Sequence, residues 1–215
     1  MQTAGRREHS AEEPVMEQGN IEFFWDAASP YTYLAATQIE PLMARTGASV
    51  VWRPFLLGKV FEATGNRMPA AVPAKAKHLF RDVQRWAQHY NVPVAFPKVF
   101  PVNSVLALRA GIAASAQGQG AAFAQALMKA YWADGADIGQ PEAVSAIAAA
   151  VGLDGAALLL QAQEQPVKDQ LRANTEEAVR RGAFGAPTFF VGEQMFWGND
   201  RLVLLEQFLR GKIAA

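Results

Sequence analysis

Residues 21–35 read IEFFWDAASPYTYLA, and the change of pattern within them determines the fold. Residues 21–25 are a short apolar run rich in aromatic side chains, which favours a buried strand. Pro30 suits the first position of a helix, because the N–H group that proline lacks has no helical partner there. The segment therefore predicts a strand that passes into a helix, with Ser29 at the helix start.

The predicted helix continues from Pro30 to about Gly47. Pro41 lies inside it, and a proline within a helix disturbs the preceding turn, so we expect a kink near Thr37. Gly47 ends the helix, and residues 49–53 predict the next strand. Apolar side chains recur along the helix at helical spacing: Tyr31, Leu34, Ala35, Ile39, Leu42 and Met43.

Between residues 58 and 166 the pattern is helical throughout. Gly152 ends one of these helices, and Asp154 suits the N-cap of the next one. Helices of this kind need a shared core, so the segment predicts an inserted helical bundle. Four apolar stripes at helical spacing lie in it: Leu79, Val83, Trp86 and Tyr90; Val105, Leu108 and Ile112; Phe123, Leu127 and Tyr131; and Val144, Ile147 and Val151.

Mixed structure returns after the bundle. Residues 167–181 predict a helix with ion pairs at favourable spacing, Glu176–Arg180 and Glu177–Arg181. Residues 188–191 and 194–197 predict two strands joined by a turn. A last amphipathic helix has Leu202, Leu205, Phe208 and Leu209 on one face. The order β-α-β, helical insertion, α-β-β-α describes an α/β domain interrupted in the middle.

The composition limits the classes of function. Of 215 residues, 51% are hydrophobic and 19% are charged, and 20 basic residues balance 20 acidic ones. No net charge therefore favours nucleic acid or an anionic membrane as a partner. No apolar run approaches the length of a transmembrane helix. Zero cysteines exclude disulfides, thiolate metal sites and dithiol redox chemistry within the chain, and three scattered histidines have no metal-binding spacing.

The first 20 residues are polar and charged, and they lack the apolar core of a secretory signal. We expect residues 1–20 to form a disordered N-terminal tail. We also expect the protein to be cytoplasmic.

Ser29 lacks the surroundings of a hydrolase nucleophile. The chain has no G-x-S-x-G motif, and His9, His78 and His89 lie in the tail and in a helical segment. A serine hydroxyl is a poor nucleophile without a base, but it donates a good hydrogen bond to a thiolate. In a chain without cysteine, such a thiolate has to arrive with a ligand. The alternative is that Ser29 is only the N-cap of its helix.

Ser29 belongs to a set of motifs that together resemble one family. They are SPYTYL at 29–34, RPFLLG at 53–58, GN at 65–66, RWA at 85–87, FP at 96–97, NS at 103–104, GAFGAPT at 182–188 and WGNDR at 197–201. Through them the chain is similar, over residues 21–212, to the 2-hydroxychromene-2-carboxylate isomerases of the kappa-class glutathione transferase and DsbA-like group.

The resemblance implies an α/β, thioredoxin-like fold with a large all-helical insertion. Residues 21–57 and 167–212 would form the thioredoxin-like domain, and residues 58–166 would form the inserted helical domain. The resemblance also implies glutathione as the cofactor and a homodimer as the assembly.

By the same resemblance, three residues hold the thiol end of glutathione. Ser29 would stabilise the thiolate. The backbone of Ala186, which precedes Pro187 across an expected cis peptide bond, would pair with the cysteinyl part as an added strand does. Taken alone, Pro187 is a proline at a strand edge with no ligand.

Three further residues are assigned to glutathione by the resemblance. Asn66 would form a hydrogen bond with it. Asn199 and Asp200 would hold the γ-glutamyl end, with Asp200 paired to the ammonium group. Taken alone, Asn66 is a structural loop residue, Asn199 a turn residue and Asp200 the N-cap of the last helix.

The carboxylate of a second substrate has four candidate partners: Lys59, Lys75, Arg85 and Asn103. The alternative for each is a solvated surface side chain. Phe61 stands where some of the resembling isomerases carry a substrate-contacting lysine, so the resemblance does not identify the particular substrate of this chain.

The sequence therefore predicts an enzyme with a small-molecule substrate. The leading interpretation is a glutathione-dependent cis–trans isomerase of an unsaturated aromatic 2-oxo acid. One alternative is a kappa-class-like glutathione transferase or peroxidase, which would consume glutathione. The other is a non-catalytic DsbA-like binding protein, which would bind ligands without turnover.

Overall fold

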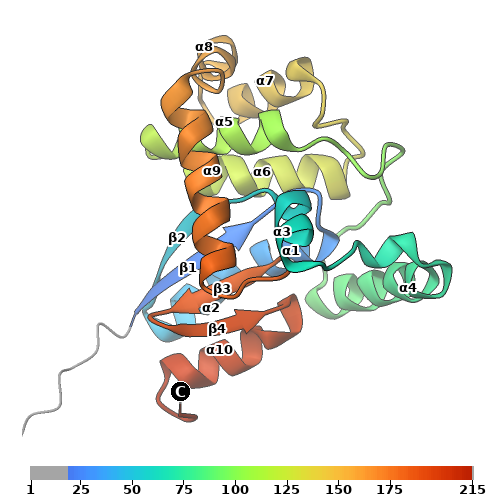
Figure 1. Cartoon of the computed structure of the whole chain (residues 1–215), viewed down its shortest axis with the longest axis vertical. Helices are drawn as coiled ribbons and strands as arrows, with labels where there is room; N and C mark the ends of the chain where they lie inside the picture. The colour runs from blue at the N-terminus through green and yellow to red at the C-terminus, as the bar shows by residue number, and fades with distance from the viewer. Residues whose placement is uncertain (1–18, 215) are drawn as a thin grey trace, which may run out of the picture.

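The computed structural model describes residues 19–214, and its centre is a four-stranded sheet (Figure 1). The strands are β1 (Asn20–Trp25), β2 (Ser49–Pro54), β3 (Thr188–Val191) and β4 (Gln194–Trp197). β1 pairs in parallel with β2 and antiparallel with β3, and β3 pairs antiparallel with β4, in the order β2-β1-β3-β4. The four predicted strands are confirmed, and β1 joins segments from both halves of the chain.

The side chains of β1 alternate between two layers of helices, as the geometry of a strand requires. Phe23 and Trp25 face one layer, where Phe23 stacks on Phe189 with 4.7 Å between ring centroids. Phe24 faces the other layer and packs edge-on against Phe190. Because the end of β1 is covered on both faces, its last three residues, Phe23–Trp25, are all apolar rather than alternating.

The first helical segment is two helices, α1 (Pro30–Ala36) and α2 (Ile39–Thr46). They separate at Thr37, whose hydroxyl donates to the carbonyl of Leu34 at 2.7 Å. Pro41 therefore causes a complete break where the sequence predicts a kink. Gly47 ends α2 with a φ of 73°, a left-handed conformation that suits glycine.

Six α-helices and one 3-10 turn (Pro69–Ala71) lie between β2 and the last part of the chain. Residues 91–104, which contain Pro93, Pro97 and Pro101, do not continue the helical pattern, so the prediction of helix throughout this region is wrong there. Asp154 caps the helix that begins at Gly155 by accepting from the N–H of Ala157 at 3.0 Å, as predicted. The six are α3 (Leu57–Thr64), α4 (Pro73–Tyr90), α5 (Val105–Ala116), α6 (Gly120–Trp132), α7 (Pro141–Ala150) and α8 (Gly155–Gln161).

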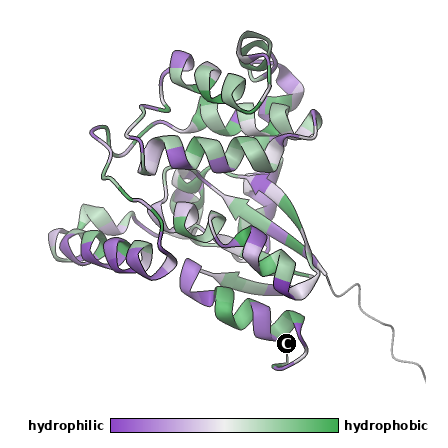
Figure 2. Cartoon of the chain, turned by 180° about the vertical axis from the view of Figure 1, so that it is seen from behind, coloured by the Kyte–Doolittle hydropathy of each residue, from purple (hydrophilic) through white to green (hydrophobic). Residues whose placement is uncertain are grey.

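The helix α4 lies apart from the cluster formed by α5–α8 (Figure 1). It carries hydrophilic residues along most of its length, whereas the clustered helices are mainly hydrophobic (Figure 2). Leu79 and Val83 form its buried stripe together with Leu34 of α1. α4 thus packs on α1 through one narrow apolar face.

The helix α9 (Gln165–Arg180) crosses the sheet on the same side as α3, and α10 (Leu202–Leu209) ends the fold (Figure 1). Arg180 binds Glu177 at 2.7 Å rather than the predicted Glu176, and two of its guanidinium nitrogens, Nε and Nη2, reach that carboxylate. The prediction that Asp200 caps the last helix is wrong. Asp200 lies within a 3-10 turn (Asn199–Arg201) before α10, and its carboxylate pairs with Arg201.

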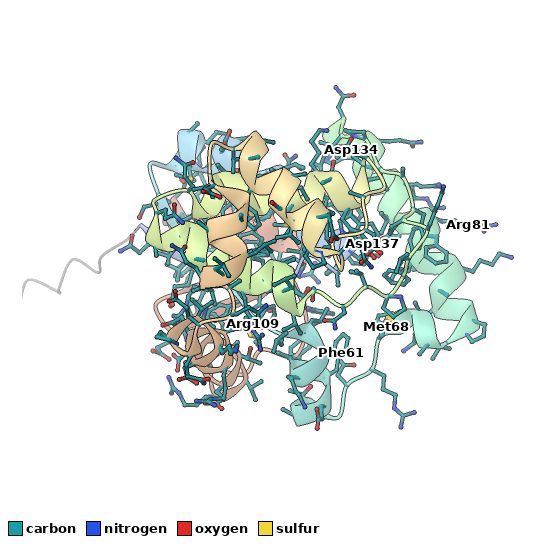
Figure 3. The ribbon with its side chains drawn as sticks, turned by 90° about the horizontal axis from the view of Figure 1, so that it is seen from above. Phe61, Met68, Arg81, Arg109, Asp134 and Asp137 are labelled. Carbon is teal, nitrogen blue, oxygen red and sulfur yellow. The ribbon has the colours of Figure 1, made fainter. Side chains whose placement is uncertain are left out.

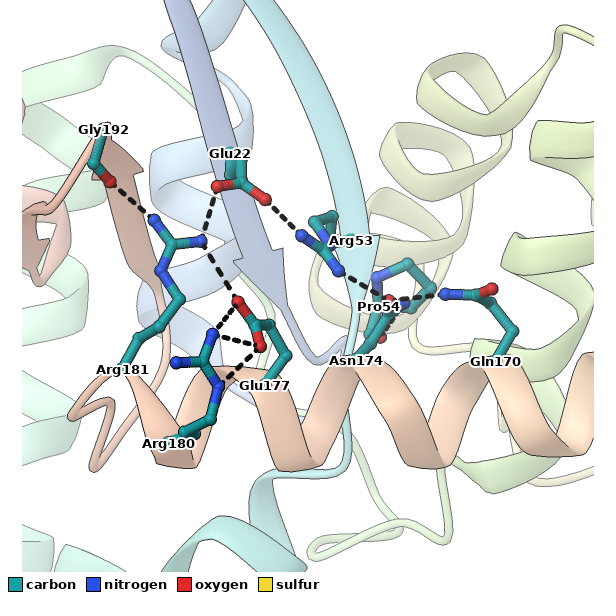
Figure 4. Close-up of polar contacts among 9 residues, drawn as sticks. All are labelled: Glu22, Arg53, Pro54, Gln170, Asn174, Glu177, Arg180, Arg181 and Gly192. Carbon is teal, nitrogen blue, oxygen red and sulfur yellow. Dashed lines mark hydrogen bonds and ion pairs between the residues drawn. The ribbon is translucent and has the colours of Figure 1, made fainter.

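A polar network ties α9 to the sheet (Figure 4). Glu22 of β1 binds Arg53 of β2 through one carboxylate oxygen and Arg181 through the other. Arg181 also lies over the ring of Phe190, 3.9 Å from its centroid, and Arg53 lies over Phe24. Hydrogen bonds and charges of the two arginines outweigh the effect of burial, so the pKa of Glu22 lies below its ordinary value.

The predicted division into a sheet domain and an inserted helical domain stays a prediction. One hydrophobic core contains Phe23 and Phe189 of the sheet together with Phe123 and Leu127 of α6. Of the predicted tail, Asn20 is the first residue of β1, and residues 1–18 lie outside the described residues. No helix between residues 19 and 214 has the length and apolar character needed to cross a bilayer.

Candidate functional site

Ser29 lies where the two ends of the fold meet. Its hydroxyl donates to the carbonyl of Ala186 at 3.2 Å, a contact between residues 157 positions apart. Its Oγ also accepts from the N–H of Thr32 at 3.3 Å, which caps α1. Only 5% of Ser29 is exposed. The cap and the contact across the site therefore coexist in one side chain.

Two groups hold the β1–α1 turn that carries Ser29. The indole of Trp132 donates to the carbonyl of Ala27 at 2.8 Å. Asp26 accepts from the N–H of Ala28 at 2.9 Å and, through its other oxygen, from the N–H of Leu57 at 3.0 Å. Asp26 thus links this turn, which carries Ser29, to the start of α3.

Asp26 is a carboxylate that the sequence analysis missed. It is 2% exposed and lies in the lining of the cleft described below. Burial raises its pKa above the ordinary value, although the N–H groups of Ala28 and Leu57 and the hydroxyl of Ser104 oppose the shift. Its position directly after a buried strand and three residues before Ser29 was the available signal.

The segment opposite Ser29 has the expected cis peptide bond between Ala186 and Pro187. The carbonyl of Pro187 accepts from the N–H of Gly198 at 3.0 Å, which fixes the segment to the end of β4. A Cβ atom at Gly185 would lie 2.4 Å from the indole nitrogen of Trp197. Glycine is required there because the indole packs directly on the backbone.

Asn66 lies beside the same segment. Its amide nitrogen donates to the carbonyl of Phe184 at 2.8 Å, and its amide oxygen accepts from the N–H of Arg67. The loop after α3 is thereby attached to the loop before β3. This arrangement brings Asn66, Ser29 and Ala186 to one cleft.

The cleft has a volume of about 720 Å³ and is mainly apolar. Figure 3 shows Phe61 and Met68 on the side of α3 that faces α4. Three polar candidates from the sequence also line it: Lys59, Lys75 and Asn103. Its apolar walls comprise Leu57, Phe61, Met68, Leu79, Phe100 and Val105.

The polar candidates differ in their surroundings. Lys59 is exposed and pairs with Glu62 at 2.7 Å, and Asn103 accepts from the N–H of Val105 at 3.1 Å at the start of α5. Arg85 is exposed on α4 and does not belong to the lining of the cleft. The structure therefore brings Lys75 and not Arg85 to the cleft, although both lie on α4.

Asn199 and Asp200 lie in the 3-10 turn that contacts α1, outside the lining of the cleft. Asn199 is 3% exposed, and its carbonyl accepts from the hydroxyl of Tyr90 at 3.2 Å. Burial, a hydrogen bond to Asp82 and the charges of Asp82 and Asp200 raise the pKa of Tyr31. Asp200 thus lies within electrostatic reach of Tyr31, two positions from Ser29.

A metal centre finds no support in the geometry. Among the described residues, no three histidine, aspartate or glutamate side chains gather in a way that could hold a metal ion.

Taken together, the fold and this site define a class of protein. The chain belongs to the family of DSBA-like thioredoxin domains, whose family model matches residues 20–210. The predicted thioredoxin-like fold with a helical insertion is confirmed by this match and by a solved structure. That structure, of a 2-hydroxychromene-2-carboxylate isomerase, superimposes with a TM-score of 0.82 at 30% identity and covers 89% of this chain and 95% of its own.

The relatives narrow the class further. A 2-hydroxychromene-2-carboxylate isomerase of Sphingobium xenophagum is 36% identical over 191 residues, which cover 88% of this chain and 97% of the relative. Glutathione S-transferase kappa 1 of Homo sapiens is 28% identical over 211 residues, which cover 89% and 91%. Both relatives are enzymes, and the predicted resemblance to this group is confirmed.

Proposed function

We propose that the protein is a glutathione-dependent cis–trans isomerase of an unsaturated aromatic 2-oxo acid. The observation that carries the proposal is the hydrogen bond from Ser29 to the carbonyl of Ala186 at the wall of an apolar cleft. The chain has no cysteine, so a thiol that reacts beside Ser29 belongs to a ligand. The relatives named for an isomerase reaction support the same conclusion.

The groups around the cleft fit glutathione, a tripeptide with a thiol, an ammonium and two carboxylates. The backbone of Ala186 lies at the cleft edge directly before β3, where an extended peptide can pair with it. Asn66 offers an amide and Lys75 a positive charge at the same cleft. Bound glutathione would supply a thiolate that adds reversibly to the conjugated double bond and leaves after rotation.

Ser29 would exchange hydrogen-bond partners when the ligand binds. Its hydroxyl has one proton, which goes to the Ala186 carbonyl in the structure described. When the cysteinyl N–H of the ligand takes that carbonyl, the hydroxyl proton becomes available to the thiolate. The N–H of Thr32 still holds the Ser29 oxygen in place. Stabilisation of the thiolate is therefore linked to correct binding of the peptide.

The apolar walls fit the aromatic part of the substrate. Phe61 and Met68 present no charge, so the ring system would lie against them. We assign the substrate carboxylate to Lys75, with Lys59 and Asn103 at the same cleft as secondary partners. We leave Arg85 out of this assignment because it lies outside the cleft lining.

Asn199 and Asp200 remain part of the proposal as partners of the γ-glutamyl end. What supports them is the charge of Asp200 near Tyr31, since an ammonium beside α1 would meet it. We also propose a cytoplasmic homodimer, on the basis of the family resemblance.

A second candidate is a glutathione transferase of the kappa type, which the human relative supports. The two candidates differ in whether glutathione is regenerated. With a purified aromatic 2-oxo acid, catalytic glutathione should sustain many turnovers of an isomerase, whereas a transferase would stop after one equivalent. Retained binding without either reaction would identify a non-catalytic binding protein.

The role of Ser29 is tested by Ser29→Ala. Loss of one hydrogen bond to a charged group costs about 1.5–3 kcal/mol, so the pKa of the bound thiol should rise by about 1–2 units. Thiolate absorbance measured against pH at saturating glutathione reports this shift. Ser115→Ala is the control, because its hydroxyl donates within α5 to Gly111 and lies outside the cleft lining. An unshifted titration in Ser29→Ala would show that Ser29 does not stabilise the thiolate.

A further inference from the structure

A second cavity lies on the opposite side of α3 from the cleft. It has a volume of about 750 Å³ and is formed by α3, α9 and one residue of α5, Arg109. Figure 3 shows Arg109 between α5 and α9, with α3 separating it from Phe61. We call this cavity the α3–α9 groove. Its lining shares only Leu56, Lys59 and Glu62 with the cleft.

The surface of the groove combines an apolar floor with charged walls. Leu56, Leu171 and Val179 are lining residues that are buried or half-buried. An apolar body of the size of a substituted benzene ring would remove this surface from water. The groove is therefore built for an amphipathic ligand and not for a simple ion.

Most charges around the groove are already paired. Lys59 binds Glu62 at 2.7 Å, and Arg180 binds Glu177 at 2.7 Å. Arg172 binds Asp169 at 2.9 Å. Two lining cations have no ion pair within residues 19–214, Arg109 and Lys168. Both are half-buried, so the groove has a local excess of positive charge.

Arg109 is the second independent sign of a ligand. Its Nε is buried and has no hydrogen-bond partner among the described residues. Leaving a buried polar group of a charged side chain unsatisfied costs free energy, and proteins rarely accept that cost without a reason. The planar guanidinium offers two parallel N–H groups, which match a carboxylate or sulfonate.

We propose that the α3–α9 groove binds a small organic anion, with an apolar body on Leu171 and Val179 and its carboxylate on Arg109. Lys168 supplies the second charge. This site is separate from the cleft that holds Ser29 and takes a ligand that does not react. The ligand class follows because the groove combines a guanidinium that has no ion pair among the described residues, that of Arg109, with an apolar surface.

The test uses 4-phenylbutyrate as the probe and 4-phenylbutanol as its uncharged counterpart. Isothermal titration calorimetry on the full chain should show that the carboxylate binds at least about tenfold more tightly than the alcohol. Arg109→Gln should lower the affinity for 4-phenylbutyrate about tenfold or more. Arg172→Gln removes an equal charge from the same groove, but one that is already paired, and should change the affinity less than about threefold.

Three results would overturn the proposal. Equal affinity of the parent and Arg109→Gln would remove Arg109 from the site, and a parent that does not bind at millimolar probe would remove the site itself. Loss of probe binding in Phe61→Ala, with Arg109→Gln unaffected, would place the probe in the cleft.

A stability measurement separates a ligand site from a structural arginine. Because Arg109 Nε has no partner, Arg109→Gln without probe should melt at the parent temperature or above it. A lower melting temperature, or dissociation of an oligomer seen by light scattering, would show that Arg109 stabilises the fold or an interface between copies. Isomerase activity should be the same in the parent and in this variant.

Discussion

Glu22→Gln should destabilise the protein, because Glu22 alone links β1 to both Arg53 and Arg181 (Figure 4). Two hydrogen bonds between charged groups are worth about 1.5–3 kcal/mol each. Glu22 is 26% exposed, so water compensates part of the loss, and the glutamine keeps a weaker bond to each arginine. We expect the free energy of unfolding to fall by about 2 kcal/mol. For a chain of this size the melting temperature should fall by about 4–8 °C.

The effect should depend on pH in a defined direction. The arginines hold the pKa of Glu22 below its ordinary value of 4.5, so the ionised form stabilises the folded state. This contribution is complete above about pH 4.5 and is lost as the pH falls through the lowered pKa. The free energies of unfolding of parent and variant, measured with urea, should thus differ by the full amount at pH 7 and should converge in acid.

Glu176→Gln is the matched control. Glu176 lies on the same helix as Arg180, but it is 72% exposed and meets Arg172 only at 3.9 Å. Its removal should cost less than about 0.5 kcal/mol at either pH. The reasoning is refuted if the two variants lose the same stability at pH 7, or if the loss in Glu22→Gln stays constant down to pH 3.

Two further predictions concern the site. Asp200→Asn should weaken glutathione binding. It should also abolish the preference of the parent for glutathione over an analogue that lacks the γ-glutamyl amine. If calorimetry shows an unchanged preference, Asp200 does not belong to the site. Gly185→Ala should displace Trp197, because the new methyl group would lie 2.4 Å from the indole nitrogen. This displacement should shift the tryptophan fluorescence and reduce glutathione affinity about tenfold. Gly19→Ala meets nothing within 4 Å and should change neither readout.

The strands and the first and last helices could be predicted from the sequence because their signals are local. The aromatic run before Ser29 and the proline after it lie within ten residues, and both act on the backbone of their own segment. Residues 91–104 did contain a local signal against a helix, because Pro93, Pro97 and Pro101 all lie within them. The packing of this loop, with Phe96 against Phe100 and Trp132, could not be predicted from the sequence.

The candidate site also depends on contacts between distant residues, which local sequence patterns do not predict. The meeting of Ser29 and Ala186 was implied by the family resemblance, since no local pattern connects residues so far apart. Lys75 and Arg85 look equivalent in the sequence, but ten positions along a helix place them on different faces, and the burial of Leu79 and Val83 decides which face points inward. Asp26 was missed because two of its three hydrogen-bond partners, Leu57 and Ser104, are far from it in the sequence.

The central position of β1 has a consequence for the making of the protein. On the ribosome, β1 can pair with β2 soon after both emerge, but its other edge waits for β3, about 160 residues later. At a synthesis rate of about 5–20 residues per second, one edge of β1 stays unpaired in the nascent chain for roughly 10–30 seconds. Such an edge is a template for wrong pairing with other chains. The unfinished protein is therefore open to wrong pairing that the finished one, with β2 and β3 on the two edges of β1, prevents.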